Sequence, residues 1–206
     1  MRRSLTWSDA SVPDSILWKT AIAAVLITHS ILLWWNATQH SPTFNELGHL
    51  PAGICEWRYG MFKLYRVNPP LPRLIAAFPV LLCDPKTDWS NYPMHAFSRE
   101  EYSMGIRFAK VNGSETFRLF AIARITCIPF CLIGGYVCYR WALQLWGNSS
   151  SLLAVVLWCF NPTILGHGPL VMPDVPAAAT GVAASYLFWQ WLRNPSWMGG
   201  MWAGVA

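Results

Sequence analysis

The chain has 206 residues, of which 54% are hydrophobic and only 12% are charged, with a formal net charge of +5. An ordinary soluble domain carries about 25% charged residues, and the 13 Trp residues belong to a type that favours membrane–water interfaces. The composition therefore predicts an integral membrane protein and argues against a soluble one. The sequence contains no dense Lys/Arg patch, which argues against nucleic-acid binding. The basic balance favours contact with anionic lipid headgroups instead.

Apolar runs along the chain predict an all-α, multi-span helical bundle. The expected spans cover about residues 16–35, 117–141, 152–165 and 176–191, and another starts at 197. That last run stops at residue 206, which is too short to cross about 30 Å of hydrocarbon. We therefore expect residues 1–206 to be a single transmembrane domain that is truncated at its C-terminus.

Residues 36–116 predict a long external first loop that contains interfacial helices. The pair Pro69-Pro70 stops any helix from running through that point. The apolar stretch 74–83 that follows is too short to span, so it suits a helix lying in the interface or a re-entrant segment.

Positive charges set the expected orientation. Arg2 and Arg3 favour a cytoplasmic N-terminus, and the loops at 140–150 and at Arg193 fall on the same side. The long loop is also basic, but the positive-inside rule is counted over loops shorter than about 60 residues. The long loop and the turn 166–176 are then expected on the non-cytoplasmic side.

Glu46 and His49 stand three residues apart, immediately beyond the first span, and would share one face of a helix. A structural role is available, because Thr43 and Glu46 match the capping-box spacing. Asp174 precedes the fourth span, where a carboxylate favours the helix N-terminus. If Glu46 and Asp174 meet at one membrane surface, they could instead provide general-base or metal-assisted chemistry. A divalent metal ion is the cofactor that this pairing would allow.

Basic residues surround the Pro-Pro turn and are candidates for phosphate binding. Arg58, Arg66 and Arg73 carry guanidinium groups, whose planar fork suits phosphate oxygens. The alternative for each of them is a basic interfacial rim that is attracted to anionic lipid.

Three stretches together resemble a known family. They are residues 43–53 (TFNELGHLPAG), residues 68–71 (NPPL) and residues 161–176 (NPTILGHGPLVMPDVP). In this order, over roughly residues 16–206, the chain resembles the dolichyl-phosphate-mannose–protein mannosyltransferase-like family. That family includes bacterial aminoarabinose transferases for lipid A and belongs to the GT-C membrane glycosyltransferases.

The resemblance implies an enzyme that uses a polyprenyl-phosphate-linked sugar. The family carries an Asp-Glu pair in its first external loop, and the Asp is its expected catalytic base. Here Asn45 stands at the Asp position and Glu46 follows, so Glu46 is expected to carry the base role. Asp174 matches the second external acidic position, near the acceptor or a metal.

The resemblance also implies a set of binding residues. Arg66 and Asn68 fall where the family contacts the donor phosphate, although this match is loose. His49 and His167 lie in the matching stretches and are expected to bind substrate.

The expected function is therefore transfer of a sugar from a polyprenyl-phosphate donor to a protein or lipid acceptor on the non-cytoplasmic face. The alternative is a non-catalytic or degenerate polyprenyl-lipid-binding membrane protein, or a transporter. Asn45 favours the degenerate protein, because an amide cannot accept a proton at useful pH. A transporter is disfavoured because only His29 and Arg124 place polar groups inside the expected spans.

Overall fold

The computed structural model describes residues 16–90 and 99–205, and these residues form ten α-helices and no strands. The helices are α1 (Ile16–Gln39), α2 (Phe44–Tyr59), α3 (Leu71–Leu81), α4 (Glu100–Asn112), α5 (Glu115–Ile125), α6 (Ile128–Trp146), α7 (Asn148–Cys159), α8 (Pro162–His167), α9 (Asp174–Arg193) and α10 (Trp197–Val205). The predicted all-α class is confirmed. Arg2 and Arg3, on which the orientation partly depends, lie outside the described residues.

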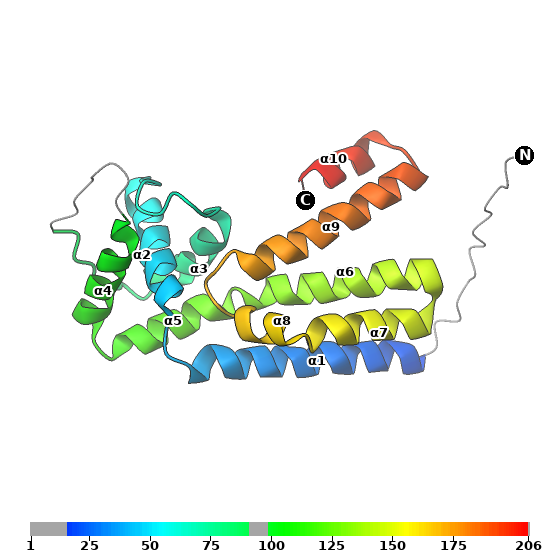
Figure 1. Ribbon diagram of the computed structural model, residues 1–206, viewed down its shortest axis with the longest axis horizontal. Helices are drawn as coiled ribbons and strands as arrows, with labels where there is room; N and C mark the ends of the chain where they lie inside the picture. Colours follow the sequence, from blue (N-terminus) through cyan, green and yellow to red (C-terminus); the bar gives the residue numbers. More distant parts are fainter. Residues whose placement is uncertain (1–15, 91–98, 206) are drawn as a thin grey trace, which may run out of the picture.

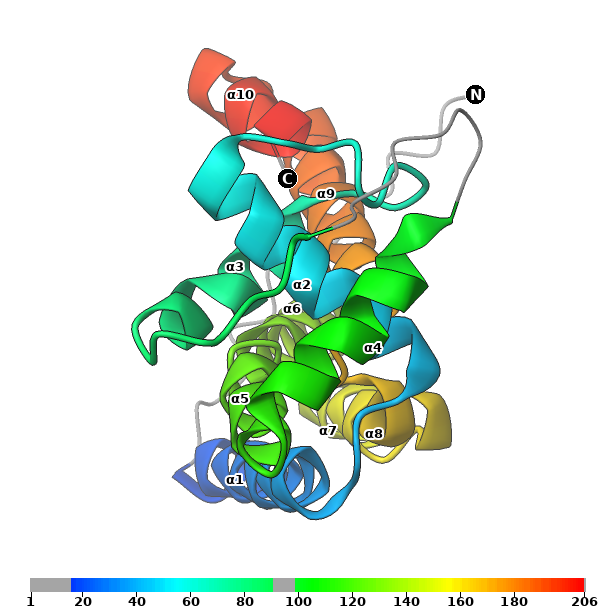
Figure 2. The same cartoon turned by 90° about the vertical axis from the view of Figure 1, so that its left-hand side faces the viewer.

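The helices form two groups that lie end to end (Figure 1). In one group α1, α6, α7 and α9 run along the long axis of the molecule, and α10 folds back against α9. In the other group α2, α3 and α4 pack together at the end where α1 stops and α5 begins. Figure 2 looks along the long axis from that end, with α4 and α2 in front of the long helices.

Two helical stretches of the described chain are long and apolar enough to cross a membrane. They are Ile16–Gln39, which is α1, and Glu115–Trp146, which combines α5 and α6. A short turn at Thr126 and Cys127 separates the two parts of the second stretch. These stretches correspond to the first two expected spans, and each extends a few residues beyond the expected limits.

The other expected spans are shorter or less apolar than a crossing helix requires. The expected span 152–165 is divided between α7, with 12 residues, and α8, with six. The division falls at Asn161-Pro162, because proline cannot continue the hydrogen-bond ladder of a preceding helix. The expected span 176–191 lies within α9, which has 20 residues. The start at 197 corresponds to α10, with nine residues.

The expected external loop is a folded unit with its own core. Helices α2, α3 and α4 pack with α5 around a cluster that includes Leu50, Ile54, Val80, Phe108 and Phe120. The helix expected near 74–83 is α3, and it begins directly after Pro69-Pro70 as the prolines predict.

Glycines allow the close approach of α2 to its neighbours. A Cβ atom on Gly53 would overlap the carbonyl oxygen of Arg73 on α3, and one on Gly105 would overlap the carbonyl oxygen of Leu47. Backbone therefore packs directly against backbone on both sides of α2, which fixes the position of the side chains at its N-terminal end.

The predicted capping box at the start of α2 is confirmed. The Glu46 N–H donates to the Thr43 hydroxyl oxygen, and the Thr43 N–H donates to Glu46 Oε2 at 2.9 Å. The helix ends at Gly60, whose φ of 62° lies in the left-handed region that glycine favours.

Candidate functional site

Glu46 lies at the centre of the molecule in a buried ion pair with Arg124 of α5. Arg124 Nε donates to Glu46 Oε1 at 2.8 Å, and Arg124 NH2 donates to Oε2 at 2.6 Å. The two side chains are 0% and 1% exposed. Two-point contact of this kind is the strongest arrangement available to a guanidinium and a carboxylate.

The same pair joins four segments that are distant in sequence. Arg124 also donates to the carbonyl oxygens of His40 at 2.6 Å and Ser41 at 2.9 Å, just beyond the end of α1. The backbone N–H of Val171 donates to Glu46 Oε1 at 3.1 Å. The segment after α1, the start of α2, the last turn of α5 and the turn after α8 therefore meet at this ion pair.

These contacts leave Glu46 little capacity for further chemistry. Burial raises the pKa of Glu46, but hydrogen bonding and charge from Arg124, with the N–H groups of Thr43 and Val171, lower it more, so the net pKa falls. Both oxygens already accept hydrogen bonds, and the side chain has no exposed surface. The geometry makes Glu46 a residue that positions other elements, whereas the sequence had suggested a catalytic base.

A divalent metal does not fit at Glu46. A cation would have to displace several hydrogen-bond donors and lie beside the positive guanidinium of Arg124. Across the described residues, no group of three or more His, Cys, Asp or Glu side chains could hold a metal ion. We therefore derive no metal-dependent step.

A polar cluster lies along the outer side of α2. It consists of Asn45, His49, Tyr65, Asn68, Arg99 and Tyr102. Asn68 Nδ2 donates to the Tyr65 hydroxyl oxygen at 3.0 Å and lies 3.5 Å from His49 Nε2. The Tyr102 hydroxyl donates to Asn45 Oδ1 at 3.3 Å. Three of the predicted site residues are thus brought together, and amides, a phenol and an imidazole are groups that bind sugar hydroxyls.

Arg99 gives the polar cluster its positive charge. Its guanidinium lies over the rings of Tyr65 and Tyr102, at 5.8 and 5.3 Å from their centroids, and it pairs with Glu101. Arg99 is exposed, so part of its fork faces solvent. Sequence reasoning missed all three residues. Arg99 and Tyr102 lie at the start of α4, far from α2 in sequence, and Tyr65 lies in the turn after α2, where no local pattern marks it.

His49 is held neutral within the cluster. Burial, followed by the positive charge of Arg73, lowers the pKa of His49 to about 4, against a weaker opposing effect of Glu46. The ring packs against Tyr65 with centroids 4.4 Å apart. A neutral imidazole can both donate and accept, and the His49 ring, which is 2% exposed, lies against the Asn68 amide within the cluster.

The arginines expected to bind phosphate occupy different environments. Arg73 is buried and pairs with Glu56, and it also donates to the carbonyl oxygens of Tyr65 at 2.8 Å and Asn68 at 3.1 Å. Its fork is therefore used in holding the 65–68 turn. Arg58 is exposed and donates to Thr87 at 2.9 Å, and Arg66 is exposed in the same turn as Asn68.

The turn between α8 and α9 presents the remaining predicted residues. His167 is the last residue of α8 and is exposed. Asp174 is the first residue of α9 and is also exposed, and its neighbour Pro173 occupies the N-cap position. Because the Val171 N–H binds Glu46, this turn is fixed to the start of α2 at a point three residues before Asp174.

Comparison with family models, curated proteins and solved structures finds no match for this chain.

Proposed function

We propose that the protein is a membrane-embedded glycosyltransferase that moves a sugar from a polyprenyl-phosphate donor to a protein or lipid acceptor. Support comes first from the three stretches in and around α2, α3 and the 161–176 turn that resemble GT-C enzymes. It comes second from the polar cluster and the exposed arginines, which offer donors for phosphate oxygens and sugar hydroxyls.

The membrane part of the proposal is supported by the exposure of apolar side chains. In the most apolar 18-residue stretch of α1, only 17% is buried within the molecule. Ile27, Ile31 and Trp35 are 60%, 62% and 64% exposed. Continuous apolar surface of this extent is unfavourable in water, whereas hydrocarbon would cover it. We propose that α1 and the α5–α6 stretch cross the bilayer, with the N-terminus cytoplasmic.

One observation carries the catalytic part: Glu46 pins the turn before Asp174 against the start of α2. Within our proposal Asp174 acts as the base, because it is an exposed carboxylate next to this turn. Both carboxylate oxygens of Glu46 are already occupied by hydrogen bonds. Asp174 would accept the proton of the acceptor hydroxyl. The acceptor oxygen would bond to the sugar as the sugar–phosphate bond breaks and polyprenyl phosphate leaves.

The donor phosphate would be held by exposed cations of the same unit. We assign this role to Arg66 and Arg99, with Arg58 further along. The sugar hydroxyls are assigned to Asn68, whose amide lies against the buried His49 ring. Arg73 acts indirectly, because it shapes the turn that carries Tyr65 and Asn68.

The deciding experiment is Asp174→Asn in the full-length protein, assayed for sugar transfer in membranes with a polyprenyl-phosphate-linked sugar. General-base catalysis contributes about 10²- to 10⁴-fold, so we expect a loss in that range with unchanged donor binding. Glu115→Gln is the control, because Glu115 is an exposed carboxylate whose partner, Arg118, has no role in the proposed site. Transfer that is unaffected by Asp174→Asn would overturn the assignment.

A second candidate is a protein that binds polyprenyl lipid without transferring sugar. Two observations favour it. Asn45 stands where the family that the chain resembles has Asp, and both carboxylate oxygens of Glu46 are already bound by Arg124. The two candidates differ in whether the native chain transfers sugar at all, and an Asn45 substitution considered below separates them.

A further inference from the structure

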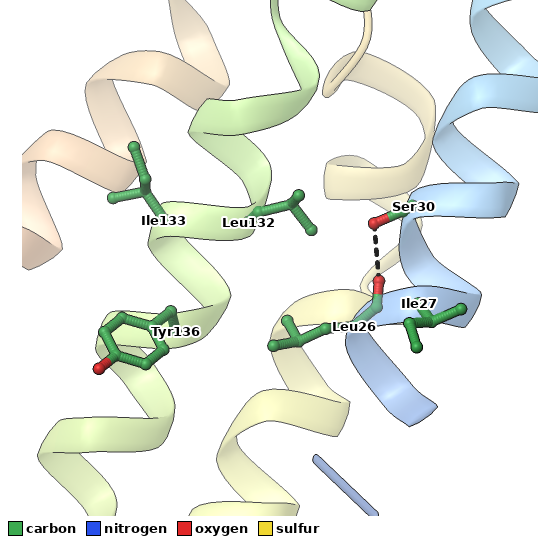
Figure 3. Close-up of a pocket in the computed structure, with 6 residues that line it drawn as sticks. All are labelled: Leu26, Ile27, Ser30, Leu132, Ile133 and Tyr136. Atoms are coloured by element: carbon green, nitrogen blue, oxygen red, sulfur yellow. Dashed lines mark hydrogen bonds between the residues drawn. The ribbon is translucent and has the colours of Figure 1, made fainter. Parts of the chain in front are cut away.

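An apolar groove lies between the middle of α1 and the first half of α6. It has a volume of about 340 Å³, and it is lined by Leu26, Ile27, Ser30, Leu132, Ile133 and Tyr136. Figure 3 shows the six side chains on the two helices, with the Ser30 hydroxyl turned back to donate to the Leu26 carbonyl. The hydroxyl that α1 contributes to the groove lining is thus satisfied within the helix, and the surface left for a ligand is apolar.

The groove lies at a depth that matches the chain region of a lipid. At 1.5 Å per residue, Leu26 lies about 15 Å from the start of α1, and Tyr136 lies about 15 Å from the end of α6. Ile27, Ile133 and Tyr136 are 60%, 47% and 49% exposed, so the groove is open along its side. An extended chain lying along the helices fits this shape better than a compact molecule.

Arg140 lies one helical turn from the groove, toward the end of α6. It donates from NH1 to the Tyr136 hydroxyl at 3.4 Å, and its Nε is buried without a hydrogen-bond partner. At 1.5 Å per residue it lies about 9 Å from the end of α6, where a lipid phosphate would meet the helix. A buried guanidinium nitrogen without an acceptor is costly, and a phosphate oxygen would satisfy it.

The surrounding charges are of one sign. Arg193, at the end of α9, lies over the Trp189 ring at 4.9 Å, and Trp141 and Tyr186 complete an aromatic patch between α6 and α9. In the described segments 126–173 and 175–205 the sequence has no Asp or Glu. Basic and aromatic side chains without carboxylates are the typical partners of anionic headgroups.

We propose that the groove and Arg140 form a site for one anionic phospholipid of the surrounding leaflet. The phosphate would bind Arg140 beside Tyr136, and one acyl chain would lie in the groove against Ile133. The inference rests on the membrane insertion in the proposed function but not on sugar transfer. The groove is lined by residues of α1 and α6, whereas the polar cluster is formed by α2, α4 and the turns beside them, so the site is distinct from the proposed donor site.

The test uses the full chain in detergent micelles, with native mass spectrometry of bound lipid. Equal amounts of phosphatidylglycerol and phosphatidylcholine are offered to the native protein and to four variants. We expect one retained phosphatidylglycerol in the native protein, and about tenfold lower retention in Arg140→Gln, from loss of a charge-assisted contact. Ile133→Trp, which fills the groove, should lower retention to a similar extent.

Matched controls are Arg118→Gln and Leu157→Trp. Arg118 is an exposed cation near the start of α5, and Leu157 is an exposed apolar residue of α7 that does not line the groove. Both controls should retain phosphatidylglycerol as the native chain does. Equal retention of the two lipids, or equal losses in variants and controls, would overturn the site.

Insertion is tested separately by flotation with neutral phosphatidylcholine vesicles. A chain that floats with these vesicles but shows no preference for phosphatidylglycerol contradicts the lipid site alone. A chain that does not float contradicts the membrane part of the proposed function as well. If Arg140→Gln fails to fold, as judged by circular dichroism, Ile133→Trp still decides the result.

Discussion

Arg124 holds both carboxylate oxygens of Glu46, although 78 residues separate the two side chains along the sequence. The pair lies where the two groups of helices meet, and it also binds the backbone after α1 and after α8. Glu46 therefore acts on the candidate site through position, because it holds the turn that precedes Asp174.

Glu46→Gln should destabilise the fold by about 3 to 5 kcal/mol, because it leaves the Arg124 charge buried without its partner. The measurement is denaturant or thermal unfolding of the detergent-solubilised protein. Glu115→Gln is the control, since it breaks the exposed ion pair with Arg118, and exposed pairs contribute little. Adding Arg124→Met to Glu46→Gln should recover part of the loss. Equal effects of Glu46→Gln and Glu115→Gln would contradict the structural role.

His49 should make stability depend on pH in a defined window. Its folded pKa of about 4 lies below the unfolded value of 6.5, so the unfolded state binds the proton first as the pH falls. The stabilisation is complete above pH 6.5 and is lost as the pH falls from 6.5 toward 4. Between pH 7 and pH 5 the free energy of unfolding should fall by about 2 kcal/mol.

His49→Gln is the variant that isolates this effect. Its unfolding free energy should change less between pH 7 and pH 5, while the decline below pH 4.5 remains, because Glu46 has a lowered pKa and titrates there. If the unfolding free energy of the variant depends on pH as that of the native protein does, a group other than His49 causes the change between pH 7 and pH 5.

Asn45→Asp separates the two functional candidates. Asn45 is exposed and accepts a hydrogen bond from the Tyr102 hydroxyl, so an aspartate can occupy the same place without a change in packing. If the native chain transfers sugar through Asp174, the substitution should change the rate by less than about tenfold, well below the contribution of a general base. Transfer that appears only in the Asn45→Asp variant would identify the native chain as a lipid-binding protein. Thin-layer chromatography of labelled products after incubation with donor lipid provides the readout.

Gly105→Ala should loosen the contact between α2 and α4. The added methyl would overlap the Leu47 backbone, so the helices must separate, at a cost of about 1 to 3 kcal/mol. Gly181→Ala in α9 is the matched control, because nothing lies within 4 Å of its Cβ position and alanine favours a helix interior by up to about 1 kcal/mol. Thermal unfolding should therefore shift in opposite directions for the two variants.

Local features of the fold could be predicted from the sequence. The capping box at Thr43 and Glu46, the stop at Pro69-Pro70 and the short apolar helix expected near 74–83, observed at 71–81, follow from patterns within a few residues. The pair Asn161-Pro162 marks the end of the expected span 152–165 in the sequence, and the structure divides this segment there into α7 and α8.

The partner of Arg124 could not be predicted. Its depth in a span indicated a need for a partner or an aqueous cavity, but the partner is on a different helix, and an ion pair leaves no periodic signal. The burial of Arg73 could not be predicted for the same reason, since its partner Glu56 lies on α2 and the carbonyl oxygens that it binds lie in the 65–68 turn. In both cases an arginine that resembled a ligand-binding group proved to connect structural elements.

The long separation between Glu46 and its partners has a consequence for biosynthesis. Ribosomes add roughly 5 to 20 residues per second, so Glu46 leaves the ribosome roughly 4 to 16 seconds before Arg124 does. The Val171 N–H, 125 positions after Glu46, arrives later still. During this interval the N-terminal end of α2 carries an uncompensated charge and cannot adopt its final buried position. The first helical unit must therefore remain open at this point until α5 has been synthesised, and a translational pause between α4 and α5 would prolong its exposure to proteases.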